Sequence, residues 1–269
     1  MQTPGFGHPG FSGFFFDGSL YATAKGGVVR VEVETGTEVP IAPAPFSVSD
    51  FVEVDGELWA IRVQFANEVL ALSRYDVELD RWDSRREQKS GSALGEDVEN
   101  RSALVGSIDG ELVVCSNDGT CAIFDPLADP MQGAWRSVSA PGAADVPGKS
   151  VVTEHGLARI VLAQKDGRGA AMYILDEGTW TQRGELLPVV GLGDETSVVA
   201  AGDWMIVFSG DQDPIIANLE TGDWAATPWP PTGARLPNTV WTGDQLIVWA
   251  GEIGSDNQAQ GAVWTPPLD

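Results

Sequence analysis

The sequence predicts an all-β fold of six similar units, each made of four short antiparallel strands. Three observations support this prediction. A two-residue turn followed by an apolar run recurs six times, with the turns at 17–18, 55–56, 109–110, 155–156, 202–203 and 243–244. An apolar run also precedes each turn, and a second turn follows the pair in most units. Helical periodicity is absent outside the stretch Ser84–Arg101, which is expected to be a loop.

The recurring turn marks the first hairpin of each unit. Asp17-Gly18, Asp55-Gly56 and Asp109-Gly110 are strong hairpin signals, because type I′ turns need positive φ at both central residues. The strands that follow include "ELWAI", "WMIVF" and "QLIVW". Successive turns are separated by 38, 54, 46, 47 and 41 residues, a period typical of repeated blades.

A second hairpin follows in each unit, and its last strand often begins with Trp. "YDVELDRW" ends at Trp82, "YILDEGTW" at Trp180 and "ANLETGDW" at Trp224. One four-stranded sheet cannot bury both of its faces, but sheets stacked as blades can. The pattern therefore predicts one six-bladed β-propeller domain over residues 1–269, with these Trp side chains packed between blades.

The units resemble Kelch repeats of the bacterial type. A Gly pair stands intact in "AKGGV" at Ala24–Val28 and degenerate in "VFSGD" and "VWAGE", and the aromatic pairs are Tyr75/Trp82 and Tyr173/Trp180. The resemblance covers nearly the whole chain and implies the fold, whereas Kelch propellers host both binding proteins and unrelated enzymes. The sixth unit lacks a fourth strand. Thr3–His8 could complete this blade, a segment upstream could do so, or the blade has three strands.

Charge and cysteine usage restrict the partners and the compartment. The 39 acids and 16 bases give a net charge of −23, which disfavours nucleic acid. A solubility or salt adaptation explains this charge better than a recruited basic partner. Cys115 and Cys121 flank a tight turn and are expected to form a disulfide, in an exported, extracellular or periplasmic protein whose signal has been removed. The alternative is two reduced thiols in a cytosolic strand pair. No apolar run is long enough for a transmembrane helix, and a monomer is expected.

Loops at one end of the blades are the expected place for a ligand. The candidate loops span 84–101, 139–149, 227–238 and 251–261, and their bases include Arg86, Arg101, Lys149 and Arg235. Trp229 is the aromatic residue that the repeat explains least. It could stack on a sugar or dock a partner side chain, or it could pack its Pro-rich loop against a neighbour. Surface ion pairing or simple solvation explains these bases better than a ligand does, because the same loops hold at least as many Asp and Glu residues.

Residues for catalysis are few. The chain has two histidines, His8 and His155, too few for a copper site like that of galactose oxidase, and it has no Walker or dinucleotide motif. Asp211 and Asp213 in "GDQDP" are weak candidates for a calcium site. The sequence thus favours a non-catalytic module that binds protein or carbohydrate and has no cofactor. The alternative is a carbohydrate-directed epimerase, lyase or hydrolase with its site at the channel mouth.

Overall fold

The computed structural model consists of β-strands and connecting segments, and no helix occurs in the part of the chain that it describes. The described residues are 13–24, 27–33, 35–64, 69–83, 86–89, 104–115, 120–127, 136–139, 148–153, 156–163, 168–176, 179–190, 192, 196–209, 212–230, 238–249, 252–253, 256–257 and 261–267. Two compact units divide the chain, the first mainly within residues 8–139 and the second mainly within 140–269. The expectation of a single domain stays a prediction.

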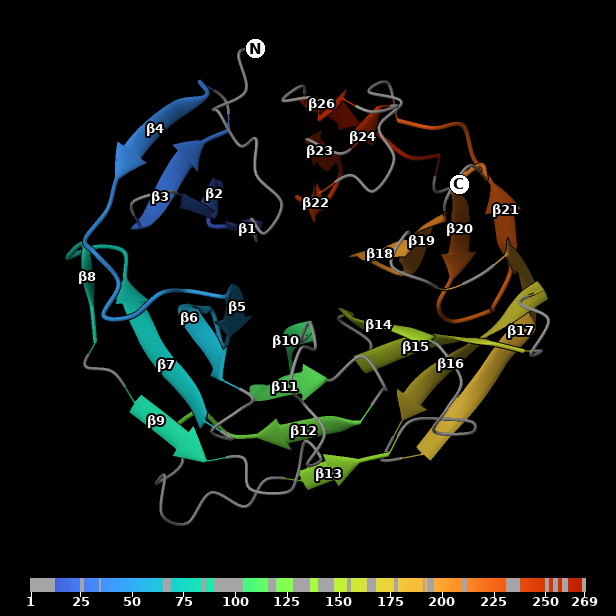
Figure 1. Cartoon of the computed structure of the whole chain (residues 1–269), viewed down its shortest axis with the longest axis horizontal. Helices are drawn as coiled ribbons and strands as arrows, with labels where there is room; N and C mark the ends of the chain where they lie inside the picture. Colours follow the sequence, from blue (N-terminus) through green and yellow to red (C-terminus); the bar gives the residue numbers. More distant parts are fainter. Residues whose placement is uncertain are drawn as a thin grey trace. The chain divides into compact units, whose positions relative to one another are not determined.

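The first unit contains three antiparallel sheets whose strands lie in chain order (Figure 1). The first sheet contains β1 (Gly13–Phe16), β2 (Ser19–Ala24), β3 (Gly27–Glu32) and β4 (Thr37–Pro40). The second contains β5 (Asp50–Val54), β6 (Glu57–Gln64), β7 (Val69–Asp76) and β8 (Arg81–Trp82). The third contains β10 (Leu104–Ile108), β11 (Glu111–Cys115), β12 (Cys121–Phe124) and β13 (Arg136–Val138). Each sheet is therefore one blade of the predicted four-stranded kind.

The second unit adds three more blades. The fourth blade contains β14 (Gly148–Thr153), β15 (Gly156–Leu162), β16 (Arg168–Asp176) and β17 (Thr179–Val190). The fifth contains β18 (Thr196–Ala201), β19 (Trp204–Ser209), β20 (Ile215–Asn218) and β21 (Trp224–Ala226). The last contains β22 (Asn238–Trp241), β23 (Leu246–Trp249) and β26 (Gly261–Trp264). Within the described residues the last blade has three strands, in the order β22-β23-β26. Thr3–His8, a candidate fourth strand, lies outside those residues. The all-β fold of propeller blades is confirmed.

The Asp-Gly turns have the backbone that the sequence predicts. Asp17, Asp55 and Asp109 have φ of 45°, 51° and 51°, and the glycine after each one is also at positive φ. Positive φ at both central residues is the property of a type I′ turn. Each turn fixes the register between the first two strands of its blade, so that Phe16 faces Ser19 and Val54 faces Glu57.

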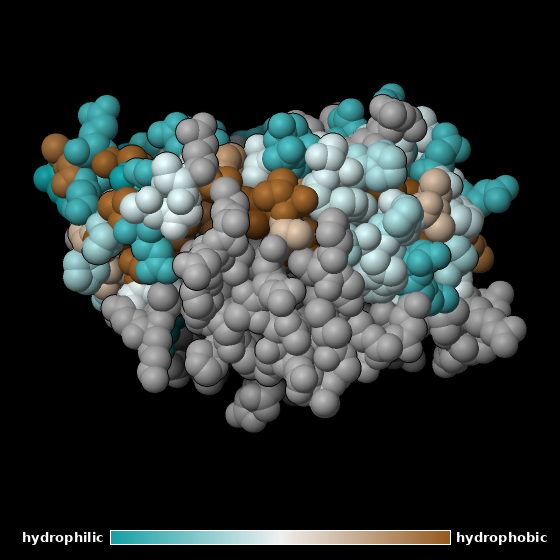
Figure 2. Space-filling view, turned by 90° about the horizontal axis from the view of Figure 1, so that it is seen from above, coloured by the Kyte–Doolittle hydropathy of each residue, from teal (hydrophilic) through white to brown (hydrophobic). Residues whose placement is uncertain are grey.

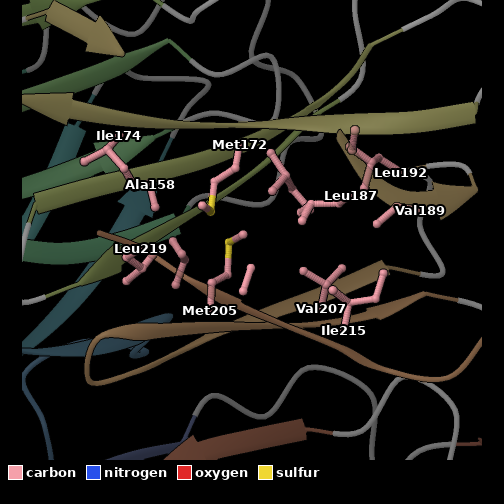
Figure 3. Close-up of a cluster of buried hydrophobic side chains, with 14 residues drawn as sticks. Ala158, Met172, Ile174, Leu187, Val189, Leu192, Met205, Val207, Ile215 and Leu219 are labelled. Atoms are coloured by element: carbon pink, nitrogen blue, oxygen red, sulfur yellow. The ribbon is translucent and has the colours of Figure 1, made fainter. Parts of the chain in front are cut away.

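The core lies between neighbouring sheets within each unit. In the second unit, Met172 of β16 and Met205 of β19 point their sulfur atoms toward one another (Figure 3), among buried residues of two sheets. In the first unit, Trp59 of β6 packs with Leu112 and Phe124 of the next sheet. Hydrophilic residues cover much of the described surface seen in Figure 2, with hydrophobic residues exposed between them. Middle strands of the sheets, such as β12, β15 and β19, are therefore buried at nearly every position.

The prediction that the outer-strand Trp residues pack between blades is confirmed for Trp82, which is half-buried against residues of the first two sheets, but wrong for Trp224. Trp82 lies directly opposite Tyr75, with ring centroids 4.7 Å apart. Trp224 lies opposite Ala217, which offers no ring, and 38% of its surface stays exposed. The pairing of Tyr173 with Trp180 also differs, because a shorter turn places Tyr173 opposite Gln182.

Two segments expected to be loops contain strands. Residues 86–89 form β9 (Arg86–Lys89), which pairs with β7, and residues 252–257 contain the short pair β24 (Glu252–Ile253) and β25 (Asp256–Asn257). Strand β7 is eight residues long and β8 only two, so β7 leaves an edge that β9 can occupy. The candidate base Arg86 therefore lies in a strand, and Lys149 lies at the start of β14.

A disulfide joins Cys115 to Cys121, as the sequence predicts. The two residues are Cα partners in the register of β11 and β12, and both are buried. In the chain-entropy account a bond across so short a loop contributes about 2 kcal/mol.

Gly222 and Gly184 form a close backbone contact between adjacent blades of the second unit. Both residues have positive φ, 80° and 63°, and a Cβ at Gly222 would collide with the backbone N and Cα of Gly184. We expect Gly222→Ala to destabilise the fold by about 2–4 kcal/mol, because strain in the left-handed region adds to this collision. Thermal and urea unfolding would measure the change.

Gly18→Ala is the matched control for this prediction. Gly18 has φ of 72°, and a Cβ there would meet nothing within 4 Å. We expect it to cost about 1–2 kcal/mol from the backbone alone. Equal losses in the two variants would show that the contact between Gly222 and Gly184 adds nothing.

Candidate binding site

Each blade has two ends. We call one of them the loop end: it carries the segment that joins the second strand to the third and the segment that joins one blade to the next. Trp229 lies there in the second unit. It follows β21 on a segment whose Thr227 N–H donates to the carbonyl of Pro214. Because Pro214 directly precedes β20, this bond places the segment beside the loop between β19 and β20. The sequence assigned Trp229 to these ends, and it lies there.

The ring of Trp229 is held in place and still reaches the surface. Its centroid lies 6.0 Å from that of Phe208, at an interplanar angle of 40°. Phe208 in turn meets the edge of Trp264 at 6.4 Å. Trp229 is half-buried and packs against the cluster that contains Ile206 and Leu246. The inner side of the Trp229 ring therefore packs against neighbouring residues, which was one of the two alternatives. Ligand binding through the exposed part of the ring stays a prediction.

The other predicted ligand-binding residues are only partly brought together. Lys149 is half-buried in β14, opposite Ile160. Beside it, Arg159 is 1% exposed and its Nη1 donates to Ser150 Oγ at 2.8 Å. The sequence analysis missed Arg159, although a lone Arg inside the apolar run "LARIVL" was a usable signal. Arg101 and Arg235 lie outside the described residues, and so do the side chain of Arg86 and both histidines.

Among the described residues, no further metal ligand joins Asp211 and Asp213, the candidates for a calcium site. Asp213 is exposed just before β20, and Asp211 lies outside the described residues. Over the described ranges, no group of three or more His, Cys, Asp or Glu residues is arranged to hold a metal ion. The calcium assignment of Asp211 and Asp213 stays a prediction.

Asp50 is a titratable group at the loop end of the first unit that the sequence did not single out. It begins β5, and its Oδ1 accepts the N–H of Phe51 at 2.9 Å. Burial of the carboxyl raises the pKa of Asp50 to about 7, although that hydrogen bond opposes the rise. A carboxyl with such a pKa can donate or accept a proton near neutral pH.

A cavity of about 670 Å³ opens at the opposite ends of the first two blades, where the two-residue turns lie. Its lining is Phe16, Asp17, Glu53, Gly56, Glu57, Leu58, Arg74, Tyr75, Asp76, Val77 and Glu78. The sequence predicts function at the loop ends and gives no sign of this cavity, because its walls come from three separate stretches of the chain. All three stretches belong to the first unit.

A hydrogen-bonded network fixes the aromatic side of the cavity. Tyr75 is buried, and its hydroxyl donates to Asp80 Oδ1 at 2.6 Å. The same oxygen accepts the N–H of Ala42 at 2.8 Å, and the Trp82 indole N–H donates to the Ala42 carbonyl at 2.7 Å. Burial first, and then the bond to Asp80, raise the pKa of Tyr75 well above its usual range. The phenol therefore stays protonated and acts as a donor.

Comparison with known proteins supports the fold. No family model matches the sequence, and no curated protein matches it. The chain is similar to a solved structure described as oligogalacturonate lyase in complex with manganese, at 13% identity and TM-score 0.60, over 95% of this chain and 76% of that one. It is also similar to the structure of YjhT, at 11% identity and TM-score 0.62, over 98% and 97% of the two chains. Such likenesses show a shared fold, here a β-propeller.

No membrane-spanning helix is found among the described residues.

The raised pKa of Asp50 predicts that Asp50→Asn stabilises the folded protein by an amount that depends on pH. The ordinary Asp pKa is 3.8, so as pH rises the unfolded chain loses this proton before the folded chain does. The folded chain must hold this proton while the unfolded chain has released it, so the free energy of unfolding falls from about pH 4 to pH 7 and stays low above it. We expect Asp50→Asn to raise the melting temperature by several degrees at pH 8 and by almost nothing at pH 4.

Melting curves at five pH values would measure this difference, with the exposed Asp213→Asn as a control of equal charge change. A constant offset between Asp50→Asn and the parent protein across the pH range would contradict the assignment.

Proposed function

We propose that this chain is a non-catalytic binding module that takes a carbohydrate at the loop ends of its blades. The observation that carries the proposal is Trp229, a half-buried ring held by Phe208 at the loop end of its blade. A rigid aromatic surface loses little conformational entropy when a ligand covers it. Binding surfaces are enriched in such residues.

Carbohydrate is the favoured ligand class for two reasons. An exposed part of an indole ring offers an apolar face beside a polar edge, which suits the mixed surface of a sugar. One of the similar folds is described as an oligogalacturonate lyase. The Kelch-type assignment belongs to this proposal, as does export, which the disulfide between Cys115 and Cys121 favours because such bonds persist in oxidising compartments.

The proposal predicts that Trp229→Leu weakens oligosaccharide binding by about tenfold, since loss of an aromatic anchor removes more than 1 kcal/mol. Leu keeps an apolar contact with Phe208, which limits the effect on folding. A panel of neutral and uronic-acid oligosaccharides would be screened on an array. The strongest binder would then be titrated calorimetrically into both proteins.

Trp224→Leu is the matched control, because Trp224 is an exposed tryptophan on an outer strand. We expect its affinity to equal that of the parent protein. An equal loss in both variants would contradict the role of Trp229. Absence of any oligosaccharide binding would contradict carbohydrate as the ligand.

A carbohydrate-directed enzyme is the second candidate, and Asp50 is the observation that favours it. Its pKa of about 7 suits general acid–base catalysis, and it stands at the loop end of β5. On this hypothesis Asp50 transfers a proton to or from a bound sugar.

This candidate predicts turnover that Asp50→Asn lowers by about 100-fold or more, the usual contribution of a general acid or base. The parent protein, Asp50→Asn and a control at the exposed Asp223, Asp223→Asn, would be incubated with oligogalacturonate and with neutral oligosaccharides. Mass spectrometry and NMR would detect cleaved, unsaturated or epimerised products. Equal product from the parent and Asp50→Asn, or none from the parent, would reject the enzyme hypothesis.

A further inference from the structure

The cavity at the turn ends of the first two blades is a second place where a ligand could bind, independent of the proposed function at the loop ends. Its volume of about 670 Å³ falls within the range of small-molecule sites. Strand ends and tight turns build it, so its shape is largely formed before any ligand arrives.

One side of the cavity is apolar and fixed. Phe16, Leu58, Tyr75 and Val77 contribute to its lining. Tyr75 is held by Trp82 at 4.7 Å and by the edge of Tyr21 at 6.0 Å between ring centroids, besides its bond to Asp80. A ring held on three sides can form a wall of the cavity without reorganising.

The other side is strongly acidic. Five carboxylates line the cavity, against one guanidinium, that of Arg74. This guanidinium is already engaged, since Nη1 lies 2.6 Å from Glu57 Oε1 and Nε lies 3.0 Å from Asp83 Oδ2. Its charge is therefore offset before any ligand enters.

The remaining carboxylates differ in their partners. Asp76 accepts the N–H of Leu79 at 3.0 Å and lies 3.8 Å from Arg81. No hydrogen bond or ion pair within the described residues involves the carboxylates of Asp17, Glu53 and Glu78. These three side chains leave a net negative field over an apolar wall.

We propose that this cavity binds an organic cation, an ammonium or guanidinium group carried on an apolar stem. The carboxylates of Asp17, Glu53 and Glu78 attract the charged group, and the stem covers Phe16 and Val77. An aromatic face also attracts a cation within about 6 Å of its centroid. Anionic ligands are repelled here, and a neutral molecule of the same shape gains only the apolar contact.

Calorimetric titration of cadaverine, a five-carbon diamine, tests the proposal, with the isosteric neutral 1,5-pentanediol as the reference ligand. We expect saturable binding of cadaverine and none of the diol. Raising the salt from about 0.02 M to about 0.3 M should weaken cadaverine binding severalfold, because salt screens exposed charges.

The double variant Glu53→Gln with Glu78→Gln locates the binding. It removes two charges, retains their shape and leaves the ion pairs of Arg74 in place, and we expect cadaverine affinity to fall about tenfold. The control Glu38→Gln with Glu185→Gln removes the same charge from two exposed positions away from the cavity. We expect it to leave the affinity within about twofold.

Three results would overturn the proposal. Equal losses in the two double variants would mean that the amine associates with the acidic surface as a whole. Equal binding of cadaverine and pentanediol would show that charge plays no part. Binding of a lysine-rich peptide without any binding of cadaverine would mean that the surface recognises a macromolecule. Loss of cadaverine binding leaves the oligosaccharide experiments unaffected, because these concern Trp229 at the loop ends.

Discussion

The need to bury both faces of every sheet controls the rest of this structure. A sheet of four short strands is marginal alone, because one face at least would remain in water. The inner strands show the solution: β12 is buried at every position and β19 at every position but its first. Their apolar residues meet those of the next sheet, as Met172 and Met205 do. The outer strand β21 faces solvent at every position, whereas the longer outer strand β17 still buries Leu187 and Val189.

This packing makes the two ends of each blade unlike. At one end the first two strands join through a two-residue turn, whose positive φ values leave little freedom. At the other end longer segments connect the blades, and one of them packs Ile41, Phe46 and Val48 against the core. Function is usually assigned to such longer segments. The cavity nevertheless lies at the turn ends, because residues 77–80 form a wider turn that Tyr75, Asp80 and Ala42 brace together.

Local patterns accounted for most of the fold, and non-local contacts account for what they missed. Asp-Gly turns, apolar runs and the Cys115–Cys121 hairpin are local signals, so blades and disulfide could be predicted. The exposure of Trp224 could have been predicted from Ala217, which stands where "YDVELDRW" has its Tyr. Strand β9, by contrast, depends on the free edge of β7, which no single stretch of sequence shows. The same holds for the site. Trp229 stood out locally, whereas the pKa of Asp50 and the cavity arise from residues that only folding brings together.

The net charge of −23 does not determine the sign of each site. Charges on a protein surface are screened over about 8–10 Å at physiological salt, so a ligand responds mainly to the groups within that distance. In the second unit, the bases Lys149 and Arg159 lie close together on the paired strands β14 and β15, despite the negative charge of the whole chain. In the first unit, the only base lining the cavity is already offset by Glu57 and Asp83. A strongly acidic chain can therefore present different local charges at different positions, because the field at each position depends on a few neighbouring side chains.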